Sequence, residues 1–145
     1  MRLVSQRWRV PPRDERDALG LPPRHRALVR EVVLSSGNAP WIFARSVLPA
    51  ASMHGLRWRI LRLDTTPLGQ VLFSIPGMQR TRVTVTRPRG TATLVARCGS
   101  VLGEGVLPRW QRDSIFSHQG RRLLVSEAFL DDMVDAISNR NGGNR

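Results

Sequence analysis

Two charged side chains interrupt apolar strand segments and could form a binding site for a small polar molecule. The segments 27–34 and 121–130 are apolar on both faces of a strand, and Arg30 and Glu127 each break one of these faces. Burying a charge without a partner is costly, so each must pair with the other, with a different residue, or with a polar ligand in a cavity. The pattern alone favours a buried or edge ion pair. The alternative is an anion-binding guanidinium group that faces a carboxylate in contact with a ligand hydroxyl.

A helix start supplies a third candidate. Thr66 and Pro67 are typical of an N-cap residue followed by proline at the first helical position. Proline has no N–H, so Leu68 and Gly69 would offer the first free backbone donors, and helix N-termini attract carboxylates and phosphates. Gly69 would also let a ligand approach closely. An ordinary capped helix explains the same residues.

Other residues are weaker candidates. Arg45 shares a strand face with Trp41 and Phe43, where it could supply a second cation or stack on the indole ring. Arg112 has the same ambiguity. Cys98 is the only cysteine, so an internal disulfide is excluded and packing is its expected role. The three histidines lie far apart without ligand spacing, so no metal site is predicted.

The elements that would position these residues are mostly strands. Alternation and turn residues predict strands over the segments 1–10, 27–34, 41–48, 80–87, 109–116 and 121–130. Helical spacing and proline signals predict helices over 50–63, 66–75 and 131–137, and a helical turn over 16–19. The segment 90–105 is compatible with a helix or a strand. The predicted fold class is α+β, with one antiparallel sheet covered on both faces.

The composition fits one domain and excludes several classes of protein. The chain has 145 residues and a net charge of +12, from 23 basic and 11 acidic residues. No apolar run approaches the roughly 20 residues that cross a bilayer, and the N-terminus lacks a signal-peptide core. We therefore expect a cytoplasmic protein without a membrane span. The arginines are scattered rather than gathered in one stripe, so a nucleic-acid partner has no support beyond the net charge.

Four blocks of the sequence resemble the chorismate pyruvate-lyase (chorismate lyase) family in order and spacing. The blocks are LVREVVL (28–34), PWIFARSVLP (40–49), TPLG (66–69) followed by LF (72–73), and WQRDS (110–114) with GRRLLVSEAFL (120–130). They cover most of the chain from residue 3 onward. No single block is diagnostic, but their combination is typical of this family.

The resemblance implies a fold in which helices, some of them flaps, cover a buried ligand cavity. It implies a lyase that converts chorismate to 4-hydroxybenzoate and pyruvate, the first step of ubiquinone biosynthesis, without a metal or organic cofactor. By the same resemblance, Arg30 binds the ring carboxylate, the N–H of Leu68 binds the same group, and Glu127 contacts the ring hydroxyl as the catalytic residue. Strand alternation and the helix start mark the same three positions, so the ligand-site interpretation becomes the preferred one.

The resemblance also sets expectations for the domain. Residues 1–138 are expected to form one chorismate lyase-like domain, and 139–145 a disordered tail. We expect a monomer whose partners are its substrate and products. The family's N-terminal helices, with a methionine whose backbone contacts the ligand, have no match, which implies either a misassigned start codon or a shortened and impaired form. The alternative function is a non-catalytic module that senses a small carboxylate.

Overall fold

The protein folds around one antiparallel sheet, as predicted. The computed structural model describes residues 1–88 and 92–142. The strands are β1 (Arg2–Arg9), β2 (Ala27–Ser36), β3 (Ala39–Pro49), β4 (Gln79–Thr86), β5 (Trp110–His118) and β6 (Arg121–Phe129). The helices are α1 (Arg13–Leu19), the 3-10 helix η1 (Ala50–Met53), α2 (Arg57–Leu61), α3 (Leu68–Ser74), α4 (Thr93–Leu102) and α5 (Asp131–Gly142). The strand order is β1-β2-β3-β6-β5-β4.

Two hairpins form the centre of the sheet. The turn between β2 and β3 contains Gly37, whose φ is +59°, and the turn between β5 and β6 contains Gly120, whose φ is +74°. Glycine adopts this left-handed backbone without the steric cost of a side chain, which explains why both predicted turns form. β6 pairs with β3, so the second hairpin lies between the first hairpin and β4. The strands that carry Arg30 and Glu127 are therefore separated only by β3.

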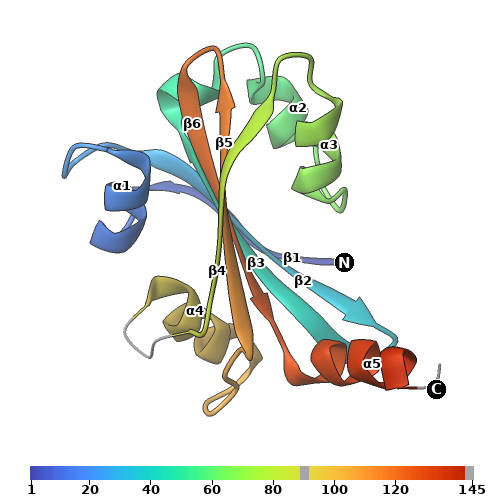
Figure 1. Ribbon diagram of the computed structural model, residues 1–145. Helices are drawn as coiled ribbons and strands as arrows, with labels where there is room; N and C mark the ends of the chain where they lie inside the picture. Colours follow the sequence, from blue (N-terminus) through green and yellow to red (C-terminus); the bar gives the residue numbers. More distant parts are fainter. Residues whose placement is uncertain (89–91, 143–145) are drawn as a thin grey trace.

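Helices cover both faces of the sheet, as the apolar strands predicted. In Figure 1, α2, α3 and α5 lie on one side of the sheet, and α1 and α4 lie on the other. We call these sides the α3 face and the α1 face. On the α3 face, an apolar cluster joins the sheet to α2 and α3; its most deeply buried members include Leu28, Leu48, Ile60, Leu72 and Leu123. On the α1 face, α4 packs on the sheet through a cluster that includes Val33, Phe43, Leu94, Cys98 and Ala128.

Several helix boundaries differ from the predictions. The helix expected over 50–63 is divided into η1 and α2, with Gly55 at a φ of +76° between them. The N-cap of α3 is Pro67, not Thr66, because the backbone of Pro67 is extended and no side chain caps the helix. The undecided segment 90–105 contains α4, which begins at Thr93. α5 continues to Gly142, four residues into the segment expected to be a disordered tail, whereas 143–145 lie outside the described residues.

Candidate ligand site

Arg30 lies in the middle of the sheet, on the α3 face. In the register of the sheet it is flanked by Gln6 on β1 and Ser46 on β3. The register across β6 and β5 adds Val125 and Ser114 to the same row. Residues opposite one another on neighbouring strands project from the same face. The row therefore crosses the α3 face next to the apolar cluster beneath α2 and α3, and Arg30 within it is only 2% exposed.

Neutral oxygen atoms hold the guanidinium group of Arg30. Its Nη1 donates to Oε1 of Gln6 at 2.8 Å, and its Nη2 donates to the carbonyl oxygens of Asp64 at 2.7 Å and Thr66 at 3.3 Å. None of the ion pairs among residues 1–88 and 92–142 involves Arg30. Burial lowers the pKa of Arg30, and the nearby charge of Asp64 opposes this only in part. The α3 face thus contains a buried cation that is not paired with a carboxylate of the described chain.

The start of α3 lies beside this cation. The Thr66 carbonyl that accepts from Arg30 is two residues before Leu68, the first residue of the helix. The side chain of Leu68 is buried in the apolar cluster with Leu72, which fixes the helix start over the sheet. The first N–H groups of a helix have no acceptor within the helix. The structure therefore brings two of the three predicted site residues together.

Glu127 occupies the same face, one step further along the sheet. Its register partners are Ala44 on β3 and Arg112 on β5. Strand spacing and rise put its backbone about 10 Å from that of Arg30 across the sheet and about 7 Å further along it. Oε2 of Glu127 accepts from Nε of Arg112 at 2.7 Å. Glu127 therefore forms an ion pair, as one interpretation predicted, and its partner is Arg112 on the neighbouring strand. Arg30 forms none among the described residues, and β3 separates its strand from that of Glu127.

Arg112 contacts an aromatic ring as well as Glu127. Its guanidinium carbon lies 5.3 Å from the centroid of the Phe129 ring, the arrangement of a cation–π contact. The Arg112 side chain is 36% exposed and that of Glu127 is 19% exposed. The hydrogen bond to Glu127 raises the pKa of Arg112 more than burial lowers it. Arg112 therefore lies over a ring, that of Phe129 on the neighbouring strand, whereas a role as a second cation for a ligand stays a prediction.

Hollows lie on both faces of the sheet. An apolar hollow of about 290 Å³ lies on the α3 face, between α5 and a part of the sheet that includes Phe129. A more polar cavity of about 400 Å³ lies on the α1 face, with Asp14 and Asp113 in its wall. Neither is lined by Arg30 or Glu127, so one enclosed cavity that holds both groups stays a prediction. Among the described residues, no group of three or more His, Cys, Asp or Glu side chains is arranged to hold a metal ion.

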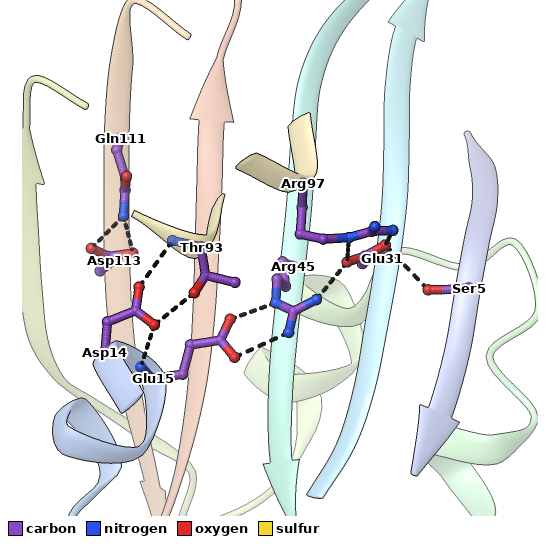
Figure 2. Close-up of polar contacts among 9 residues, drawn as sticks. All are labelled: Ser5, Asp14, Glu15, Glu31, Arg45, Thr93, Arg97, Gln111 and Asp113. Carbon is purple, nitrogen blue, oxygen red and sulfur yellow. Dashed lines mark hydrogen bonds and ion pairs between the residues drawn. The ribbon is translucent and has the colours of Figure 1, made fainter. Parts of the chain in front are cut away.

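Arg45 belongs to a separate ionic cluster on the α1 face (Figure 2). It donates to both carboxylate oxygens of Glu15 on α1 and to Glu31 on β2. Arg97 on α4 donates to both oxygens of Glu31 at 2.8 Å, and Ser5 on β1 donates to the same carboxylate at 3.2 Å. Arg45 and Glu31 are each 1% exposed. Arg45 therefore anchors α1 and β2 instead of supplying a cation to the α3 face or stacking on a ring, because Glu31 lies opposite it in the sheet.

This cluster, which consists of Glu15, Glu31, Arg45 and Arg97, escaped the sequence predictions. Burial raises the pKa of Glu15 in spite of its hydrogen bonds from Arg45. Burial also acts to raise the pKa of Glu31, but hydrogen bonds from Arg97 and Arg45 hold it below its ordinary value. A signal was present in the sequence, since Glu31 interrupts an apolar strand face just as its neighbour Arg30 does. No pattern pointed to Glu15 on α1.

Known proteins that resemble this chain identify its family. The family model described as "Chorismate lyase" matches residues 1–138. The chain belongs to the chorismate lyase family. A curated relative from Halorhodospira halophila, named "Probable chorismate pyruvate-lyase", is 40% identical over an alignment of 137 residues, which covers 92% of this chain and 71% of the relative. A relative of the same name from Thiobacillus denitrificans is 41% identical and is covered to 65% of its length. One from Shewanella loihica is 36% identical and is covered to 58%.

Several solved structures have a fold similar to that of this member of the chorismate lyase family. The effector domain of PhnF from Mycobacterium smegmatis has a TM-score of 0.58 and 17% identity, with 90% of this chain and 79% of that one covered. A transcriptional regulator of the GntR family from Enterococcus faecalis V583 has a TM-score of 0.59 and 14% identity, with 91% and 94% covered. At these identities the likeness concerns the fold alone. In the part of the chain that is described, no helix is long and apolar enough to cross a membrane.

Proposed function

We propose that this chain carries the lyase activity for which its relatives are named, the conversion of chorismate to 4-hydroxybenzoate and pyruvate. The observation that carries the proposal is the guanidinium group of Arg30, which is 2% exposed and has no carboxylate partner among the described residues. A buried charge without a counterion is costly, and an anionic ligand would neutralise it. Chorismate and 4-hydroxybenzoate both present a ring carboxylate.

Arg30 and the N–H of Leu68 would bind this ring carboxylate together. The hydrogen bond from Arg30 to the Thr66 carbonyl is 3.3 Å long, whereas the bond to the Asp64 carbonyl is 2.7 Å. A carboxylate is a stronger acceptor for a guanidinium group than a neutral carbonyl, so we expect it to replace Thr66. The segment that contains Thr66 leads directly into α3. Ligand binding would therefore be coupled to the position of the helix start.

Glu127 would contact the ring hydroxyl group as the catalytic residue. In the elimination, the bond between ring carbon C3 and the enolpyruvyl oxygen breaks, and its electron pair leaves with the enolpyruvate. Ring carbon C4 loses its proton, and the electrons of that C–H bond complete the aromatic ring. The proton ends on the methylene carbon of the enolpyruvate, which becomes pyruvate. Atoms and electrons balance without an oxidant, a reductant or a cofactor, so the proposed reaction is cofactor-independent.

The task of the protein in this reaction is to bind and orient a dianion. Formation of the aromatic ring makes the elimination strongly favourable, so holding chorismate in a reactive conformer and excluding water supply the catalysis. Glu127 would orient the hydroxyl group or assist the proton transfer, and its ion pair with Arg112 fixes its position. The remaining parts of the proposal are a monomeric, cytoplasmic enzyme and a place at the first step of ubiquinone biosynthesis.

The decisive experiment incubates the purified protein with chorismate and follows both products. We expect equal amounts of 4-hydroxybenzoate and pyruvate. Arg30→Met should weaken 4-hydroxybenzoate binding by about 10- to 100-fold, the worth of hydrogen bonds to a charged group, and should abolish turnover. Arg59→Gln is the matched control, because Arg59 is an exposed arginine on α2 and should change neither quantity.

Three results would contradict parts of this proposal. Unchanged affinity in a folded Arg30→Met variant, with folding checked by its thermal unfolding, would remove Arg30 from the site. Wild-type protein that binds 4-hydroxybenzoate tightly but produces none from chorismate would favour the alternative, a module that senses a small carboxylate. Wild-type protein that neither binds nor converts these compounds would end the proposal as a whole.

A further inference from the structure

The side chain of Arg112 is only partly used by the contacts within the protein. Its Nε donates to Glu127 at 2.7 Å, and its guanidinium group lies over the ring of Phe129. Neither terminal nitrogen, Nη1 or Nη2, donates to any residue in the described ranges. A guanidinium group that is fixed through Nε presents its two terminal nitrogens in one plane, the geometry that binds a carboxylate in a bidentate manner.

The proposed substrate has a second carboxylate that needs a partner. Chorismate carries one carboxylate on the ring and another on the enolpyruvyl group, and Arg30 would bind only the first. The enolpyruvyl group is attached to C3, the carbon next to the C4 that bears the hydroxyl group. If Glu127 contacts that hydroxyl, the enolpyruvyl group lies beside Glu127. Arg112 is the residue directly opposite Glu127 in the sheet.

Other arginines near this part of the sheet are less suitable. Arg80 on β4 donates through Nε and Nη2 to Oγ of Ser114, at 3.2 and 2.9 Å, so one edge of its guanidinium group is occupied. Arg109 lies 3.5 and 3.3 Å from two carboxylates of α5, and its own side chain is half exposed. Arg112 also adjoins space, since Phe129 beneath it lines the apolar hollow of about 290 Å³ under α5.

We propose that Arg112 binds the enolpyruvyl carboxylate of chorismate, and thereby distinguishes the substrate from 4-hydroxybenzoate, which lacks this group. The inference rests on the proposed function and adds a specificity-determining residue to the same site. Arg30 and Arg112 would then hold the two ends of the dianion, with Glu127 between them at the hydroxyl group. After the elimination, Arg112 would retain pyruvate while Arg30 retains the aromatic product.

The test compares two ligands in the Arg112→Gln variant. We expect KM for chorismate to rise by about 10- to 100-fold, because a charge-assisted pair is lost, and the inhibition constant of 4-hydroxybenzoate to change less than about threefold. Arg112→Lys should recover part of the chorismate affinity, since it restores the charge but not the planar pair of donors. Arg109→Gln is the control, because this arginine pairs with α5 and should leave both constants unchanged.

A purely structural role for Arg112 predicts a different result. If the residue only positions Glu127, both ligands lose affinity together, because both present the ring hydroxyl, or kcat falls while KM for chorismate stays the same. Either result would overturn the inference, provided that thermal unfolding confirms a folded variant. If wild-type protein fails to convert chorismate, the proposed function fails first; if only the Arg112→Gln result disagrees, the proposed function stands and this inference falls.

Discussion

The carboxyl group of Glu127 pairs with Arg112 and, in the proposed function, would also contact the hydroxyl group of the substrate. Replacing it by glutamine keeps the shape and the hydrogen-bonding capacity but removes the charge. We predict that Glu127→Gln lowers kcat by about 10²-fold or more, the usual contribution of an acid–base residue. The amide can still contact the hydroxyl group, so the inhibition constant of 4-hydroxybenzoate should change by less than about tenfold. Steady-state kinetics with product inhibition measures both constants.

Glu104→Gln provides the control for this substitution, because Glu104 is exposed in the loop after α4. Its kinetic constants should equal those of the wild type. Full activity in Glu127→Gln would show that Glu127 serves only as the partner of Arg112. Equal losses in kcat and in 4-hydroxybenzoate affinity would instead assign it to ligand binding without a part in the proton transfer.

At the scale of elements, the sequence predicted the positions of the strands much better than the order of the strands in the sheet. Period-two alternation predicted β2 and β6 and the faces of Arg30 and Glu127, because that pattern is a local property of the chain. The partners of these residues depend on β3 lying between the two strands and on β5 lying beside β6. No local pattern specifies that order. The sequence therefore located two charged positions but not the neutral oxygens around Arg30 or the pairing of Glu127 with Arg112.

Helix boundaries were harder to predict for a related reason. The spacing of apolar residues over 50–63 is helical throughout, yet the left-handed backbone of Gly55 ends η1 and lets the chain turn before α2. Both pieces still contribute Met53 and Ile60 to the same apolar cluster. Burial of these side chains, which depends on the whole sheet, decides the local geometry here more strongly than helix propensity does.

The ionic cluster on the α1 face links α1 and α4 to the centre of the sheet, in addition to their apolar contacts. Glu31 accepts from Arg97 on α4 and from Arg45, which also binds Glu15 on α1. These hydrogen bonds keep the pKa of Glu31 below its ordinary value. The stability that Glu31 contributes is therefore present above its unfolded-state pKa and is lost as the pH falls through its lower folded-state pKa. Acid should therefore weaken the attachment of α4, which is held to Glu31 through Arg97.

We predict that Glu31→Gln lowers the free energy of unfolding by about 1.5–3 kcal/mol near neutral pH, the range for hydrogen bonds to charged groups. The difference from the wild type should shrink as the pH falls through the lowered folded-state pKa of Glu31, where the wild-type carboxyl group becomes protonated as well. Urea unfolding at several pH values measures it. Glu104→Gln again serves as the control and should show no such difference. If the difference in the free energy of unfolding between variant and wild type stays constant with pH, or increases in acid, the pKa of Glu31 is not lowered by folding.

The whole molecule carries a net charge of +12, and the proposed substrate is a dianion. Like-signed charge spread over the surface attracts oppositely charged ligands from a distance, and this attraction is screened by salt. The screening length falls from about 30 Å at 0.01 M to about 3 Å at 1 M ionic strength. We therefore predict that kcat/KM for chorismate decreases steadily over this range, and that the association rate of 4-hydroxybenzoate, a monoanion, decreases about half as steeply on a logarithmic scale.

Stopped-flow binding and initial rates at matched ionic strengths measure the two slopes. The thermal unfolding midpoint, recorded in parallel, separates screening of the ligand from any change in the protein itself. Equal slopes for the two ligands, or rates independent of salt, would mean that the charge of the whole molecule does not act on the substrate, and that only the arginines within the site attract it.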